Sequence, residues 1–232
     1  MDFDFVTLKF LIFLGFLSFA SIQDVKSRYI SDKIWIIAGI VFIPILLFEI
    51  FTGRFAFFET IISAVLAIAI AFYLSKIGFL GGADVLALVL LAIYMPTLQN
   101  KEIFGLPIIS VIANASIFSL TTVFVNFSRN VSRLMQKRNI FYGFEVEPMH
   151  RKILAVFLGY RSEEVKGLFL PMEIVENGRR RFNFGARSSS DFVRGNDIWV
   201  TPALPFIVYI TAGYIFLFLI GDMLHLFKSL LF

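Results

Sequence analysis

The sequence predicts an all-α polytopic membrane protein of about six transmembrane helices, with a small cytoplasmic α+β insert that contains a β-hairpin. Three observations predict this class. Of the 232 residues, 58% are hydrophobic, and the mean hydropathy is +0.83, far above that of an ordinary soluble domain. Apolar runs of about 20 residues, long enough to cross a bilayer as a helix, recur along the chain. A single long polar stretch, residues 128–198, interrupts them.

Six apolar segments have the composition of membrane-spanning helices. They cover residues 4–23, 34–51, 55–76, 84–98, 106–127 and 199–221. The sequence therefore predicts three parts: residues 1–127 with the first five helices, the insert 128–198, and residues 199–232 with the sixth helix and a C-terminal tail. The first segment follows two aspartates rather than a basic region, so we expect a retained helix and not a signal peptide.

Basic residues predict the orientation of these helices. The insert holds 13 of the 21 Lys and Arg residues, and four of the 13 lie between positions 129 and 138, directly after the fifth segment. Basic residues close to the membrane favour the cytoplasmic side. With the insert in the cytoplasm, the first loop, with Lys26, Arg28 and Lys33, also faces inward. Both termini then lie outside.

Within the insert, Asn177-Gly178 stands between apolar and β-branched residues. Both residues accept positive φ, so the pair predicts a β-hairpin with its tip at 176–179. The basic run Arg179–Arg181 follows. No RNA- or DNA-binding motif accompanies this run, and a solvated strand end near anionic lipid is the simpler interpretation. We expect no nucleic-acid partner.

Two acids stand at the edges of apolar segments. Asp84 follows glycines in GFLGGADVLALVLL, and Asp24 lies in SFASIQDVKSRYISD. The predicted orientation puts both at the cytoplasmic rim, where they can meet if the first and fourth helices pack together. Gly81 and Gly82 leave the backbone open to a substrate strand. Each acid also has a plainer interpretation: Asp84 as a helix N-cap, and Asp24 as the ion-pair partner of a nearby basic residue.

Two carboxylates placed together predict acid–base chemistry. They cannot both ionise easily, so they share a proton. The ionised acid takes a proton from water, and the protonated acid polarises a scissile carbonyl. The chain has no cysteine and two histidines, which excludes thiolate catalysis and argues against a zinc site. We expect no metal and no cofactor.

At this point the residues resemble a known family. IQDVKSRYISD, GGAD, DIWVTPALPFIVYITAGY and LIGDML are similar to segments of the archaeal preflagellin (prearchaellin) and type IV prepilin-like peptidases, membrane aspartyl proteases of the GxGD group. The resemblance implies that Asp24 and Asp84 are the catalytic dyad. It also implies cytoplasmic cleavage of short basic leader peptides from preflagellin and pilin-like precursors. Gly81, Gly82 and Ala83 would lie beside the substrate.

Ala83 stands where the family pattern has glycine, so one methyl narrows the space beside Asp84. Bacterial prepilin peptidases carry a cysteine-based zinc motif and methylate their product. A chain without cysteine implies cleavage without methylation.

Other functions are open at this stage. Pro202-Ala203-Leu204 matches the PAL tripeptide of presenilin and signal-peptide-peptidase proteases, although six spans do not fit their nine. A non-enzymatic proton-coupled transporter would also hold acids in the membrane, but transporter sites lie near the midplane rather than at one edge. A purely structural membrane scaffold would not explain why Asp84 follows two glycines at the start of an apolar segment.

Overall fold

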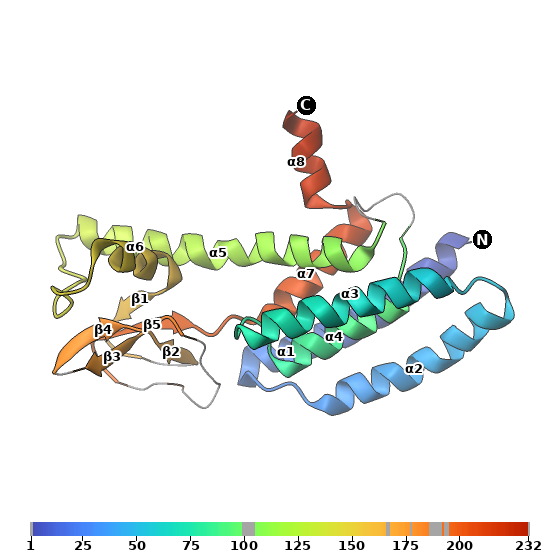
Figure 1. Cartoon of the computed structure of the whole chain (residues 1–232), viewed down its shortest axis with the longest axis horizontal. Helices are drawn as coiled ribbons and strands as arrows, with labels where there is room; N and C mark the ends of the chain where they lie inside the picture. The colour runs from blue at the N-terminus through green and yellow to red at the C-terminus, as the bar shows by residue number, and fades with distance from the viewer. Residues whose placement is uncertain are drawn as a thin grey trace. The chain divides into compact units, whose positions relative to one another are not determined.

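The protein is described from a computed structural model, in which residues 2–98, 105–165, 168–176, 178–185, 192 and 195–231 are placed. The helices are α1 (Asp2–Ser27), α2 (Asp32–Phe51), α3 (Phe57–Lys76), α4 (Gly82–Tyr94), α5 (Pro107–Met135), α6 (Met149–Leu158), α7 (Phe206–Leu219) and α8 (Met223–Leu231) (Figure 1). The strands are β1 (Tyr160–Ser162), β2 (Phe169–Pro171), β3 (Glu173–Glu176), β4 (Arg179–Phe182) and β5 (Ile198–Pro202). The chain divides into two compact units, one of residues 1–118 and 205–232 and the other of residues 119–204.

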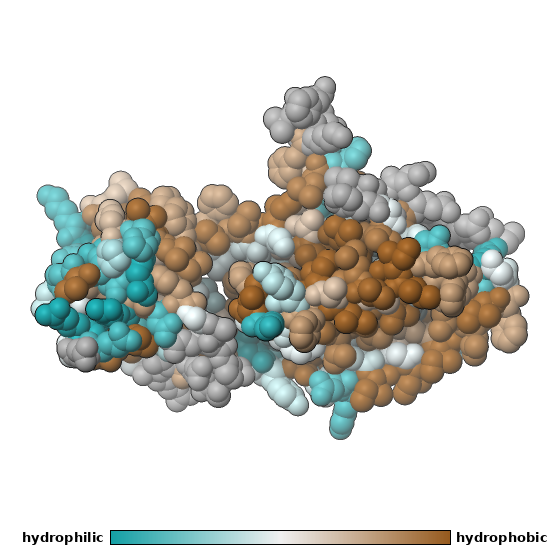
Figure 2. All heavy atoms as spheres, viewed as in Figure 1, coloured by the Kyte–Doolittle hydropathy of each residue, from teal (hydrophilic) through white to brown (hydrophobic). Residues whose placement is uncertain are grey.

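The first unit carries most of the apolar helices. Among the described residues, four helices are long and apolar enough to cross a membrane: Phe5–Ser27, Asp32–Phe51, Phe57–Lys76 and Pro107–Met135. The helices α4 and α7 are shorter but equally apolar. On the face shown in Figure 2, hydrophobic residues cover much of this helical unit, whereas hydrophilic residues gather over the second unit. The prediction of a polytopic membrane protein with a small α+β insert is confirmed.

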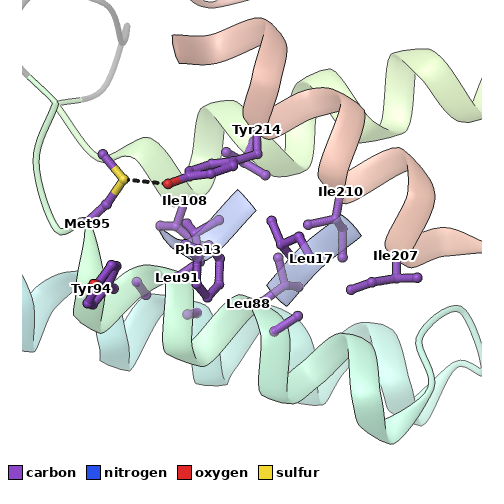
Figure 3. Close-up of a cluster of buried hydrophobic side chains, with 14 of the residues drawn as sticks. Phe13, Leu17, Leu88, Leu91, Tyr94, Met95, Ile108, Ile207, Ile210 and Tyr214 are labelled. Carbon is purple, nitrogen blue, oxygen red and sulfur yellow. Dashed lines mark hydrogen bonds between the residues drawn. The ribbon is translucent and has the colours of Figure 1, made fainter. Parts of the chain in front are cut away.

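The core of the first unit lies where α1, α4 and α7 meet (Figure 3). Helix α3 packs along α4, and α1 packs along α7. The fully buried side chains at the centre are Phe13 and Leu17 from α1, Leu88 and Leu91 from α4, and Ile207 and Ile210 from α7. Near them, the Tyr214 hydroxyl donates to the sulfur of Met95 (Figure 3). Large apolar side chains from three helices therefore fix α1 against α4.

A close approach and a polar cluster join α5 to α7 within the first unit. A Cβ at Gly213 would lie 2.8 Å from the carbonyl oxygen of Val111, so only glycine lets the two backbones come this near. Beyond the end of α7, Ser110 Oγ donates to Asp222 Oδ2 at 2.6 Å, and Leu224 N donates to Asp222 Oδ1 at 2.8 Å. Asp222 therefore caps α8, and its hydrogen bonds account for its burial.

The second unit is a small α+β structure. Its three-stranded sheet has the order β1-β5-β2, with antiparallel neighbours, and β3 pairs with β4 in a separate two-stranded sheet. Trp199 is fully buried and donates through its indole N–H to the carbonyl of Ile140 at 3.1 Å. The predicted hairpin is confirmed by the pairing of Glu176 with Arg179. Asn177 lies outside the described residues, and Gly178 has a φ of +75°.

The predicted start of the sixth span was wrong. Ile198–Pro202 forms β5 at the centre of the sheet, and α7 begins only at Phe206. The run Ile-Trp-Val-Thr is apolar and β-branched, so it suits a buried strand as well as a membrane helix, and hydropathy does not separate the two. Pro202 ends the strand. Pro205 is the N-cap residue of α7.

Candidate active site

Asp84 stands in the first turn of α4, at the third helical position. Its Oδ2 accepts a hydrogen bond of 2.9 Å from the backbone N–H of Gly81, the extended N-cap residue. Backbone N–H groups at a helix start have no partner within the helix, and an acid at this position satisfies one of them. Asp84 is only 9% exposed. The plainer interpretation of Asp84 is thus partly correct, because the carboxylate does take part in capping.

Asp24 stands in the last turn of α1 and is equally buried, at 9% exposure. Its Oδ2 lies 3.7 Å from Nη1 of Arg28, one helical turn further along. The turn that follows α1 is closed by the backbone N–H of Ser31, which donates to Oε1 of Gln23 at 3.1 Å. The first loop therefore folds back over the end of the helix that carries Asp24.

Asp24 and Asp84 lie close enough for the charge of Asp24 to act on Asp84. Helices α1 and α4 are in contact, and Phe13 and Leu17 of α1 share one core with Leu88 and Leu91 of α4. One turn before Asp24, the Ser21 hydroxyl lies 2.8 Å from the Thr211 hydroxyl, which holds the end of α1 against α7. Two buried carboxyl groups at adjoining helix ends have the composition needed for acid–base chemistry on a peptide bond.

The glycines before Asp84 differ in their surroundings. Gly81 and Gly82 are both exposed, and a Cβ at Gly82 would meet no atom within 4 Å. Ala83 is half-buried and packs against the hydrophobic core. The open side of the α4 start is therefore at Gly82, and the methyl of Ala83 faces the core. This explains how alanine is accommodated at the position where the family pattern has glycine.

Arg28 contributes more to the site than the sequence indicated. Its guanidinium reaches back to Asp24 because the residue has a φ of +55°. The Nε and Nη1 atoms are buried without a hydrogen-bond partner among the described residues. Positive φ at a non-glycine residue is uncommon, and nothing in the local sequence signals it. Among the described residues, no group of three or more His, Asp or Glu side chains is arranged to hold a metal ion.

Comparison with known proteins identifies the family. The model of the type IV leader peptidase family matches residues 11–125, which include both acids, and the model described as Archaeal Peptidase A24 C-terminus Type II matches residues 149–223. A protein of Methanocaldococcus jannaschii named preflagellin peptidase is 29% identical over 226 residues, covering 88% of this chain and 89% of the relative. A preflagellin peptidase of Methanococcus maripaludis is 28% identical over 218 residues, covering 88% and 90%. The chain therefore belongs to the type IV leader peptidase family and is a multi-pass membrane peptidase.

Proposed function

We propose that this protein is an aspartyl endopeptidase that removes short basic leader peptides from preflagellin and pilin-like precursors at the cytoplasmic face of the membrane. The observation that carries the proposal is the meeting of Asp24 and Asp84. Both are buried, Asp24 in the last turn of α1 and Asp84 in the first turn of α4, and the charge of one acts on the other, in a chain of the leader peptidase family. The names of the two relatives support preflagellin as the substrate.

In the proposed reaction the two carboxyl groups share one proton. The ionised carboxylate takes a proton from a water molecule, which attacks the scissile carbonyl carbon. The protonated carboxyl donates a hydrogen bond to the carbonyl oxygen and stabilises the charge that develops there. Water is the nucleophile, so no covalent enzyme intermediate forms. The open backbone at Gly82 lets an extended substrate strand pass close to Asp84.

Charge supports the proposed membrane side. Lys26, in the last turn of α1, and Lys33, at the start of α2, are exposed on either side of the first loop, and Arg129 is exposed near the end of α5. Basic residues next to membrane helices favour the cytoplasmic side. That orientation places both termini outside and the acids inside, beside the leader of a precursor that has not yet crossed the membrane. The apolar helix of the precursor would remain in the lipid.

The basic hairpin does not favour a nucleic-acid partner. Arg180 forms ion pairs with Glu173 at 3.2 Å and with Asp197 at 3.4 Å, and Arg181 lies 3.8 Å from Glu176. These acids offset much of the charge that a phosphate backbone would need. Of the other candidate functions, neither a presenilin-like protease nor a proton-coupled transporter is favoured by the family match.

The test uses the full-length protein purified in detergent with a preflagellin precursor. We expect wild-type protein to shorten the precursor, and Asp24→Asn and Asp84→Asn each to abolish cleavage. Asp32→Asn is the matched control, because Asp32 is an exposed acid at the start of α2. It should retain wild-type activity. Full activity in either Asp24→Asn or Asp84→Asn would rule out the aspartyl dyad.

A further inference from the structure

The most informative group not used in the proposed reaction is the side chain of Arg28. Its backbone N–H still bonds to the carbonyl of Asp24 at 2.9 Å, which closes the last turn of α1. The φ of +55° then turns the chain sharply toward the next loop. The result is a side chain that is 17% exposed, with Nη1 3.7 Å from Asp24 Oδ2. A long basic residue in a short loop would ordinarily extend into water.

Within the described part of the chain, two donors of this guanidinium have no acceptor. Nε and Nη1 are both buried, and neither has a hydrogen-bond partner among the described residues. The 3.7 Å separation from Asp24 is an ion pair, but it is longer than a hydrogen bond. Buried donors are normally satisfied, so two that are left over beside a catalytic candidate need an explanation. Here they lie next to a carboxylate of the proposed dyad.

A peptide provides the missing acceptor. An extended chain running past the dyad presents a carbonyl oxygen at every residue, whatever its side chains are. A basic side chain of the leader would be repelled by Arg28, so the backbone is the part of the leader that suits this position. We propose that Arg28 is a substrate-binding residue whose Nε and Nη1 donate to a backbone carbonyl oxygen of the precursor beside the scissile bond. This inference rests on the proposed function.

The alternative is that Arg28 acts only through Asp24, by holding its charge and position. The substitution Arg28→Lys separates the two. Lysine keeps the positive charge near Asp24 but lacks the fork of planar donors. Loss of a contact made equally to substrate and transition state raises KM and leaves kcat unchanged, whereas a disturbed dyad lowers kcat.

The experiment measures cleavage kinetics of the full-length protein on a preflagellin precursor. For Arg28→Lys we expect KM to rise about ten-fold, the effect of losing one charge-assisted hydrogen bond, with kcat within about two-fold of wild type. Lys33→Gln is the control, because Lys33 is exposed at the start of α2. It should leave both constants unchanged. A wild-type KM in Arg28→Lys, or a lower kcat at constant KM, would overturn the inference.

A binding measurement covers the case in which Arg28→Lys is poorly active or unstable. In the Asp84→Asn background, a fluorescent peptide spanning the leader junction should bind about ten-fold more weakly when Arg28→Lys is added. Equal binding with and without Arg28→Lys would reject Arg28 as a substrate contact. Absence of cleavage by the wild-type protein would instead count against the proposed function itself, so the two failures are distinguishable.

Discussion

The backbone N–H of Gly81 donates a 2.9 Å hydrogen bond to Oδ2 of Asp84, three residues later. This bond fixes the carboxylate at the start of α4, because the N-cap residue and the third helical residue hold each other in place. The hydrogen bond that caps the start of α4 thus also orients one of the two proposed catalytic acids. Gly81 also has φ and ψ of −80° and 166°, an extended conformation that residues other than glycine adopt readily.

A substitution at Gly81 tests whether this hydrogen bond matters for catalysis. Gly81→Pro keeps a compatible φ but removes the N–H. We expect it to lower kcat at least about ten-fold, because Asp84 loses the donor that orients it. Gly81→Ala is the control, since it keeps the N–H and its Cβ would lie at an ordinary 3.6 Å from Asp84 Oδ2. If both variants cleaved the precursor equally well, the bond would have no catalytic role.

The ionisation of Asp197 should make the stability of the second unit depend on pH. Hydrogen bonds from Arg161 hold the pKa of Asp197 below its ordinary value of 3.8, against an opposing effect of burial. One of these bonds, from Nη2 to Oδ2, measures 2.6 Å. A lowered folded-state pKa contributes stability above the unfolded pKa, and that stability is lost as pH falls through the folded value. The contribution therefore begins to fall below about pH 4 and is lost at lower pH.

Asp197→Asn should remove this pH dependence. Asn tolerates the φ of +56° at this position, so the backbone should be unchanged. Trp199 is buried in the same unit, and Trp35→Phe leaves it as the single tryptophan reporter. We expect the thermal midpoint, followed by its fluorescence, to fall as the pH is lowered below about 4. In Asp197→Asn the thermal midpoint should depend less on pH and should be lower at neutral pH. If the midpoint of the variant and of the wild type fell equally with pH, Asp197 would not be the acid-sensitive group.

A buried ion pair joins α1 to α2 in the first unit. Lys9 Nζ lies 2.7 Å from Glu49 Oε1, with side chains only 7% and 16% exposed. Removing one partner leaves the other charge buried, which costs roughly 3 kcal/mol, whereas replacing both by apolar residues is often neutral. We expect Lys9→Met and Glu49→Met each to lower the thermal midpoint in detergent, and the double variant to recover most of the loss. Additive losses in the double variant would show that the two charges are not coupled.

Much of the fold was predictable from local chemistry. Apolar segments of sufficient length predicted α2, α3 and the starts of α1 and α5 closely, because a bilayer demands continuous apolar helices. Helices α1 and α5 continue past the predicted ends at 23 and 127, to Ser27 and Met135. Asn177-Gly178 predicted the hairpin of β3 and β4, because few other dipeptides adopt the positive φ values that a two-residue hairpin turn requires. The sixth helix was misplaced at its start, because Ile198–Pro202 is apolar for a different reason: it fills the centre of a sheet formed with strands distant in sequence.

The membrane class, the approximate positions of the long spans and the types of residue available for chemistry follow from composition and from neighbours along the chain. The approach of Asp24 to Asp84 depends instead on tertiary packing, since it requires Phe13 and Leu17 of α1 to pack in one core with α4. Tertiary packing also turns Arg28 back toward Asp24, with two donors that have no partner among the described residues. Such contacts depend on how distant side chains fill one core, which no short stretch of sequence specifies.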